Sequence, residues 1–166
     1  MKNPLLIAGA AAMMLASCTT TKTYKILSKS GTDTQGTAKF VQRGGTVEMD
    51  INAYKLTPGK HAVHIHEHGD CSAADASSAG GHWNPTSEQH GKWDVGEYHK
   101  GDIGNLIADN KGTGRLIFST NKWCLGCSDS KKNIKGHAIV IHEKADDFHT
   151  QPTGNAGGRV GCIEIK

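Results

Sequence analysis

The chain has 166 residues, enough for one domain with one hydrophobic core and too few for two domains of ordinary size. Its 21 glycines, with only three Phe, three Trp and three Tyr, disfavour a helical bundle and favour a protein with many turns. The formal net charge of +3 is too small to indicate a nucleic-acid-binding protein.

The N-terminus is typical of a secretory signal peptide. Lys2 supplies a positive start, residues 5–15 form a short apolar run, and Ala16 and Ser17 are small residues before a cleavage point. The apolar run is too short to span a bilayer. We therefore expect residues 1–17 to be removed from the mature protein.

The next residue is a cysteine, in the sequence Leu15-Ala16-Ser17-Cys18. This resembles the bacterial lipoprotein box, in which the cysteine is acylated and begins the mature chain. An ordinary signal peptide that happens to contain a cysteine is the alternative. We expect a lipidated Cys18, a short tether over residues 18–23 and a bacterial cell-envelope location, periplasmic or at the outer membrane.

Residues 24–166 read as an all-β domain. In one extended run, residues 46–56, apolar or small positions alternate with polar ones, which is the period of a half-buried strand. Residues 67–112 are rich in Gly, Ser, Asp and His, and we expect a long functional loop there. The other predicted strands are residues 24–27, 38–42, 114–119, 137–142 and 159–165, which together indicate a sandwich or barrel.

Two histidines stand two positions apart, since His64 and His66 belong to His61-Ala62-Val63-His64-Ile65-His66. Side chains at i and i+2 of a strand project from one face, so both imidazoles can reach one metal ion. His142 ends a second predicted strand and can bring a third imidazole beside that pair. Imidazole suits copper and zinc.

The polar segment adds His82, His90, His99 and Asp102, at gaps of eight, nine and three residues. Spacings this wide converge only in a loop folded around an ion. Three nitrogens and one carboxylate match a closed tetrahedral zinc site. A single histidine is more often a surface or hydrogen-bonded residue than a ligand, but the whole arrangement favours metal binding.

Five sequence motifs follow one another in order along the chain. They are His64-Ile65-His66-Glu67, Gly80-Gly81-His82-Trp83-Asn84-Pro85, His99-Lys100-Gly101-Asp102-Ile103-Gly104-Asn105, His142-Glu143-Lys144-Ala145-Asp146-Asp147, and Gly154-Asn155-Ala156-Gly157-Gly158-Arg159 with Cys162. Residues 24–165 thereby resemble the copper,zinc superoxide dismutases, and five ordered motifs are more specific than any one. The resemblance implies a Greek-key β-sandwich or flattened barrel with two long functional loops.

The resemblance also implies a binuclear centre with one copper and one zinc per chain and no organic cofactor. Arg159 would guide and hold the anion beside copper, and Asp146 would join a histidine from each metal site. His61, His68, His137 and His149 match no family ligand, and we expect them to be surface or loop residues. The implied copper ligands are His64, His66, His82 and His142, and the implied zinc ligands are His82, His90, His99 and Asp102, with His82 bridging the two ions.

The implied activity is the dismutation of superoxide to oxygen and hydrogen peroxide. Copper must be the working metal because zinc has no redox chemistry, and His82 would act both as ligand and as acid. The chain departs from the family in one place. Residues 148–153 contain no Lys or Glu, whereas many relatives have a longer charged loop there, so electrostatic steering must use other residues.

Four cysteines besides Cys18 allow three complete pairings, which their number alone cannot resolve. By the resemblance, Cys162 pairs with Cys71 and ties the metal-bearing loop to the sandwich. Cys124 and Cys127 form a CxxC motif outside the family pattern. A local disulfide is the favoured interpretation in an oxidising compartment, while a copper-delivery site and a redox centre stay open.

Two other function classes compete with the enzyme. One is a non-catalytic metal-binding or copper-chaperone-like envelope lipoprotein on the same fold, and the other is a surface lipoprotein in which metal only stabilises an adhesive or structural domain. The chain keeps His64, His66, His142 and Arg159, which favours the enzyme. Dimer contacts differ between branches of the family, so a homodimer stays open.

Overall fold

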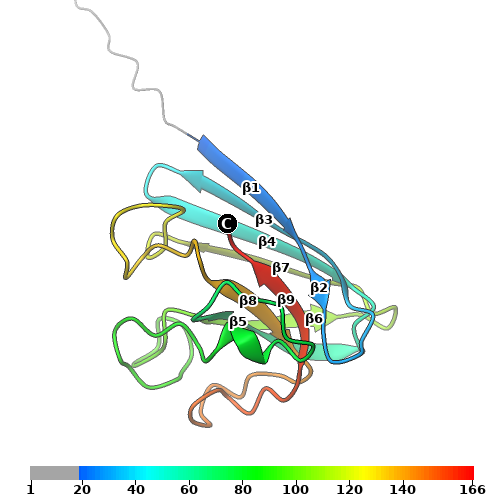
Figure 1. Ribbon diagram of the computed structural model, residues 1–166. Helices are drawn as coiled ribbons and strands as arrows, with labels where there is room; N and C mark the ends of the chain where they lie inside the picture. The colour runs from blue at the N-terminus through cyan, green and yellow to red at the C-terminus, as the bar shows by residue number, and fades with distance from the viewer. Residues whose placement is uncertain (1–18) are drawn as a thin grey trace, which may run out of the picture.

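The computed structural model describes residues 19–166, which form nine β-strands and a single turn of 3-10 helix, η1 (Figure 1). Within these residues no helix has the length and apolar character needed to cross a membrane. The expected signal peptide and Cys18 lie outside the described residues. The elements are β1 (Thr19–Lys25), β2 (Leu27–Ser28), β3 (Gln35–Arg43), β4 (Thr46–Tyr54), β5 (Gly59–His66), η1 (Ser77–Ala79), β6 (Asp102–Ala108), β7 (Gly114–Thr120), β8 (Ala138–His142) and β9 (Arg159–Glu164).

The strands form one antiparallel sheet in the order β1-β3-β4-β7-β6-β5-β8-β9-β2. Only Ile26 separates β1 from β2, so one N-terminal segment pairs with β3 at one end of the sheet and with β9 at the other. This segment nearly closes the barrel. Between β6 and β7 only two residue pairs are in register, which lets the barrel flatten into two layers.

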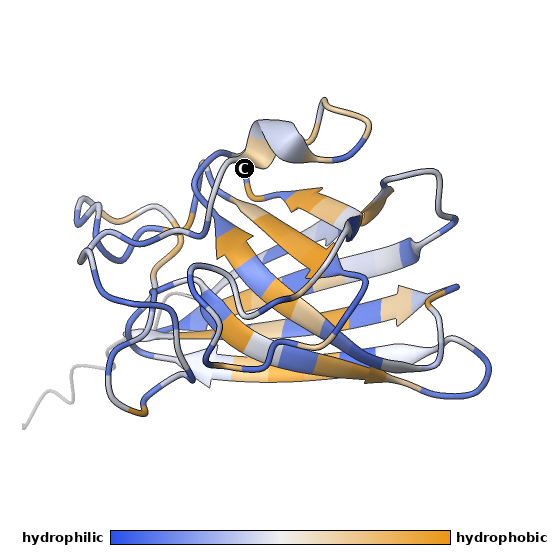
Figure 2. Cartoon of the chain, turned by 90° about the horizontal axis from the view of Figure 1, so that it is seen from below, coloured by the Kyte–Doolittle hydropathy of each residue, from blue (hydrophilic) through white to orange (hydrophobic). Residues whose placement is uncertain are grey.

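The core lies between these layers and follows the alternation of the strands. In β4, Val47, Met49, Ile51 and Ala53 are fully buried, while the residues between them point outward. Figure 2 shows this alternation as apolar and polar bands along the strands. The fold is the predicted all-β Greek-key type, a nearly closed barrel with long loops at its margins.

Two segments differ from the sequence prediction. Residues 19–23, expected to be part of a tether, are the first residues of β1 and pair with β3, because threonines favour extended backbone and β3 offers unpaired backbone groups. Residues 102–108, expected to lie in a long loop, form β6. Its alternation was hidden because Asp102 and Gly104 stand at buried positions where an apolar residue would be expected.

Candidate metal centre

His64 and His66 of β5 point away from the apolar core, on the face that the long loops cover. Val63 and Ile65 enter the core, so the alternation of the strand places His64 and His66 together on the other face. The neighbouring strand β8 ends at His142, and its Nε2 lies 3.4 Å from Nε2 of His66. All three rings are buried.

His82 completes this first group from the loop between β5 and β6. Its ring centroid lies 3.9 Å from that of His64 and 5.1 Å from that of His66. One ring nitrogen from each of His64, His66, His82 and His142 lies within 4.8 Å of all the others.

The second group surrounds the carboxylate of Asp102 at the start of β6. Oδ1 lies 2.9 Å from Nδ1 of His82 and 3.3 Å from Nδ1 of His99, and Oδ2 lies 3.0 Å from Nδ1 of His90. The same carboxylate accepts backbone N–H bonds from Gly91 and His99, at 3.1 and 2.8 Å. These bonds fold the loop onto the end of β6. The two groups share His82.

Groups outside both clusters fix which nitrogen of each ring faces inward. Nδ1 of His66 lies 2.9 Å from the carbonyl oxygen of Gly80, and Asp146 lies 2.8 Å from Nε2 of His64 and 2.9 Å from Nε2 of His90. A ring that donates one N–H in this way presents its other nitrogen as a lone pair. Asp146 thus joins one histidine of each group.

The donor set fits two metal ions. Within residues 19–166, Nδ1 of His64 and Nε2 of His82 are buried atoms without a hydrogen-bond partner, and both belong to the first group. Buried polar atoms seldom stay unpaired unless an ion or water satisfies them. Four imidazoles suit copper, and three imidazoles with one carboxylate suit tetrahedral zinc.

The electrostatics of the two groups differ. Burial disfavours charge on the imidazoles of the first group, lowers the pKa of His82 to about 4 and puts those of His66 and His142 well below the ordinary value. At His90 burial acts the same way, but the carboxylates of Asp102 and Asp146 outweigh it and raise the pKa to about 9. In the metal-free protein, neutral imidazoles of the copper-type group therefore stand beside a His90 imidazole that keeps its proton at neutral pH.

Arg159 starts β9 directly opposite His142 in the register of β8 and β9. Arg159 is half-buried, and its guanidinium donates to the carbonyl oxygens of Ala76 and Gly80, at 2.6 and 2.7 Å. The loop that supplies these carbonyls is joined to β9 by the disulfide between Cys71 and Cys162. Arg159 is therefore held in a fixed position next to the first group.

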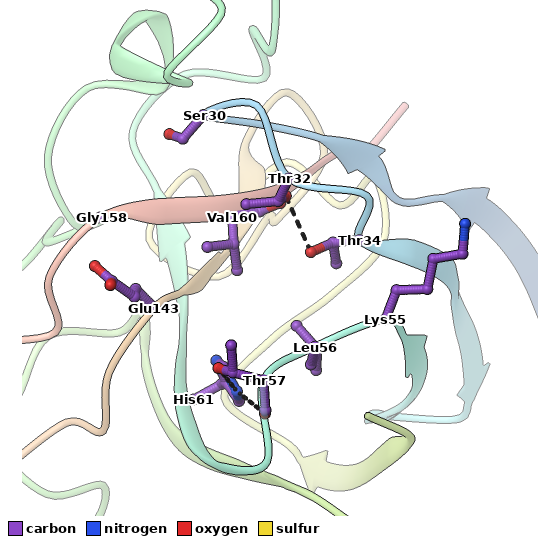
Figure 3. A pocket seen from close by; sticks show the side chains of 10 residues that line it. All are labelled: Ser30, Thr32, Thr34, Lys55, Leu56, Thr57, His61, Glu143, Gly158 and Val160. Carbon is purple, nitrogen blue, oxygen red and sulfur yellow. Dashed lines mark hydrogen bonds between the residues drawn. The ribbon is translucent and has the colours of Figure 1, made fainter. Parts of the chain in front are cut away.

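One histidine expected at the surface is buried. His61 is 2% exposed, with Nδ1 2.7 Å from the carbonyl oxygen of His142 and Nε2 2.8 Å from that of Thr57. It lies on the opposite face of β5 from His64, and that face is the interior of the barrel, so the expectation of a surface or loop residue was wrong for His61. It lines a cavity of about 340 Å³ that the metal-type groups do not share (Figure 3).

The remaining non-ligand histidines fit the surface expectation better. His68 and His149 are exposed, and His137 is partly exposed against Trp83. Sequence reasoning also missed two residues that support Asp146. The side-chain amide of Asn105 donates to the carbonyl oxygen of Asp146 at 3.0 Å and accepts from its backbone N–H at 2.7 Å. Gly154 has no side chain that would collide with the Asp146 carboxylate. Both stand in the quoted motifs, but nothing in their spacing indicated these contacts.

Comparison with known proteins agrees with this geometry. Residues 34–165 match the family described as "Copper/zinc superoxide dismutase (SODC)". The chain is 37% identical over 138 residues to "Superoxide dismutase [Cu-Zn]" of Paramecium bursaria Chlorella virus 1, covering 79% of this chain and 72% of the relative. It is 38% identical over 136 residues to "Superoxide dismutase [Cu-Zn] 1" of Aquifex aeolicus (strain VF5), covering 79% of each chain.

Among solved structures, a SOD-like protein from Bacillus subtilis superposes with a TM-score of 0.75 at 32% identity, covering 87% of this chain and 97% of the other. This superposition therefore includes most of this chain and nearly all of the other. Together with the sequence matches, it shows that this chain belongs to the copper/zinc superoxide dismutase family.

Proposed function

We propose that the group His64, His66, His82 and His142 binds copper, that the group His82, His90, His99 and Asp102 binds zinc, and that the pair of sites performs the family's reaction. That reaction is the dismutation of superoxide to oxygen and hydrogen peroxide. The observation that carries this assignment is the position of the two ring nitrogens of His82. Its Nδ1 faces Asp102, while its buried Nε2 faces the other three histidines without a partner.

Bound copper supplies the one-electron exchange that dismutation needs, which zinc cannot. His82 holds or releases a proton at Nε2 at the boundary of the two groups. Burial lowers the pKa of the His82 imidazolium to about 4, so at neutral pH the ring is neutral and carries one proton, and Nε2, which has no hydrogen-bond partner in the described residues, is free to take up or pass on a proton. Asp146 keeps His64 and His90 in the tautomers that direct their Nδ1 atoms inward.

Arg159 would bind the substrate anion. Its guanidinium is charged at any physiological pH and presents several donors in one plane, and only part of that donor set is used by the carbonyls of Ala76 and Gly80. The two carbonyl bonds hold the group still, so little ordering is needed when superoxide arrives. A merely structural metal protein would not need a half-exposed cation next to the copper-type group.

The test is metal content measured together with superoxide removal. The loaded protein should hold close to one copper and one zinc per chain and remove superoxide, and His142→Ala should lose most of the copper and the activity while retaining zinc. His149→Ala, an exposed histidine outside both groups, is the matched control and should keep both. Loss of activity without loss of copper in His142→Ala would contradict the ligand assignment.

We also propose that Cys18 is lipidated and anchors the enzyme to the bacterial envelope. Support comes from the signal-like residues before it and from relatives that include bacterial and extracellular enzymes. Radiolabelled palmitate should enter the wild-type protein and not Cys18→Ser, and only the wild type should stay with membranes. Equal labelling of the two would refute the anchor.

A further inference from the structure

The CxxC motif lies in the loop of residues 121–134 between β7 and β8, which we name the CxxC loop. Cys124 and Cys127 form a disulfide there, with Cys124 buried and Cys127 exposed. The loop folds back on itself, because the N–H of Cys124 donates to Lys132 at 2.8 Å and the N–H of Ile134 donates to Cys124 at 3.0 Å. The family's reaction makes no use of this pair.

Trp123, next to the disulfide, reaches the zinc-type group from outside. The side chain is 1% exposed, and its indole Nε1–H donates to the carbonyl oxygen of Lys100 at 3.0 Å. Lys100 stands between His99 and Asp102, whose backbones close a turn through an N–H bond of 3.0 Å. The indole therefore holds the turn that carries two of the proposed zinc ligands.

A second contact involves Trp93, which lies between His90 and His99. Its ring centroid is 5.6 Å from that of Trp123 and 4.9 Å from that of Phe118, in an edge-to-face arrangement with both. Aromatic pairs at these distances stabilise their relative position beyond simple burial. The long segment between the two histidines is thus attached at its middle as well as at its end.

The neighbouring Lys122 adds a polar contact to the same segment. Its ammonium pairs with the carboxylate of Asp94 and donates to the hydroxyl of Tyr98 at 2.5 Å. The contacts from Lys122 and Trp123 thus extend from Trp93 to Lys100.

We propose that Trp123 is a positioning residue for zinc, and that the Cys124–Cys127 disulfide acts through it by holding the CxxC loop against the turn of His99 and Asp102. The inference rests on the proposed zinc ligands. Groups behind the ligands of a metal site commonly change its affinity by about tenfold to a hundredfold when removed, because they fix the ligand geometry. The disulfide restricts the loop, so Trp123 stays in the position that its hydrogen bond requires.

The first test is the rate at which loaded enzyme transfers zinc to a chromophoric chelator. Trp123→Phe keeps an aromatic ring but removes the indole N–H, and it should release zinc roughly tenfold faster. Phe118→Leu is the matched control, because it weakens the same aromatic cluster and leaves the bond from Trp123 to Lys100 in place. It should lower thermal stability and leave zinc release within about twofold of wild type.

Cobalt(II) placed in the zinc site gives a second readout. Its visible absorption bands report ligand geometry, so they should shift in Trp123→Phe and stay unchanged in Phe118→Leu. If Trp123→Phe releases zinc at the wild-type rate with an unchanged cobalt spectrum, or if Phe118→Leu accelerates release equally, Trp123 has only a packing role and the inference fails.

The role of the disulfide is tested by combining its removal with Trp123→Phe. Replacing both Cys124 and Cys127 by serine should accelerate zinc release in the wild-type background and add little in the Trp123→Phe background, because the two changes act on one contact. Equal acceleration in both backgrounds would refute the coupling. Wild-type enzyme lacking zinc or activity would instead count against the proposed function, so the two failures are distinguishable.

Discussion

The metal-type groups are arranged by atoms that never touch a metal. The carbonyl oxygen of Gly80 fixes the ring of His66, and one carboxylate, Asp146, fixes His64 and His90 together. Each of these bonds occupies one ring nitrogen and thereby selects the other for the metal. The ligands are thus oriented by the polypeptide, and little rearrangement is required when an ion enters.

Gly154 provides the sharpest single-residue test of this support. A Cβ atom at this position would lie 2.0 Å from Oδ1 of Asp146 and 2.6 Å from Nε2 of His90, and its φ of +67° already disfavours any side chain. Gly154→Ala should therefore push Asp146 off His90. We expect a loss of zinc affinity of about tenfold or more, measured by chelator competition, together with a lower unfolding temperature.

Gly96 is the matched control, because it has the same φ of +67° and no atom within 4 Å of its would-be Cβ. Gly96→Ala bears the cost of the left-handed backbone, about 1–2 kcal/mol, without the collision. Its zinc affinity should stay near that of the wild type. If both variants lose zinc equally, backbone strain and not the position of Asp146 is the cause.

At the scale of elements, the two disulfides close segments of very different length. The Cys71–Cys162 bond closes a segment of 91 residues and links the loop before η1 to β9, while the Cys124–Cys127 bond closes only three. In the chain-entropy view, the longer closure removes far more freedom from the unfolded chain. The first bond should therefore dominate stability, and the second should act locally.

Replacing each pair by serine tests this difference. Removal of Cys71–Cys162 should lower the free energy of unfolding by about 5 kcal/mol, and removal of Cys124–Cys127 by about 2 kcal/mol. Denaturant titration of the metal-free forms gives both values, so that metal loss does not contribute. A larger loss from the short closure would show that the local loop, and not chain entropy, controls the stability.

The sequence predicted some elements better than others, for physical reasons. The apolar alternation of residues 46–56 marks β4, and the run before His142 marks β8. Strand β6 was missed because buried polar and glycine residues interrupt its pattern, and the start of β1 was missed because its seven residues lack a buried face. Periodicity identifies strands through the core they face, and these two strands give that signal weakly.

At the scale of the whole molecule, the ordered motifs predicted which residues come together, since the structure brings all seven into two clusters that share His82. The disulfide pairs also agree with the expectation. What the sequence could not provide were contacts between distant segments, such as Trp123 with Lys100 or Asn105 with Asp146. No periodicity or motif specifies such contacts, because they depend on how the loops are packed.

The strand interrupted at Ile26 has a consequence for self-association. Because β1 covers β3 and β2 covers β9, residues 19–28 shield both sides of the sheet on which another chain could otherwise template a strand. Detachment of this one segment would expose the unpaired edges of two strands at once. Such edges can pair with other chains and form domain-swapped or fibrous assemblies. The first ten described residues therefore cover the edges of both β3 and β9.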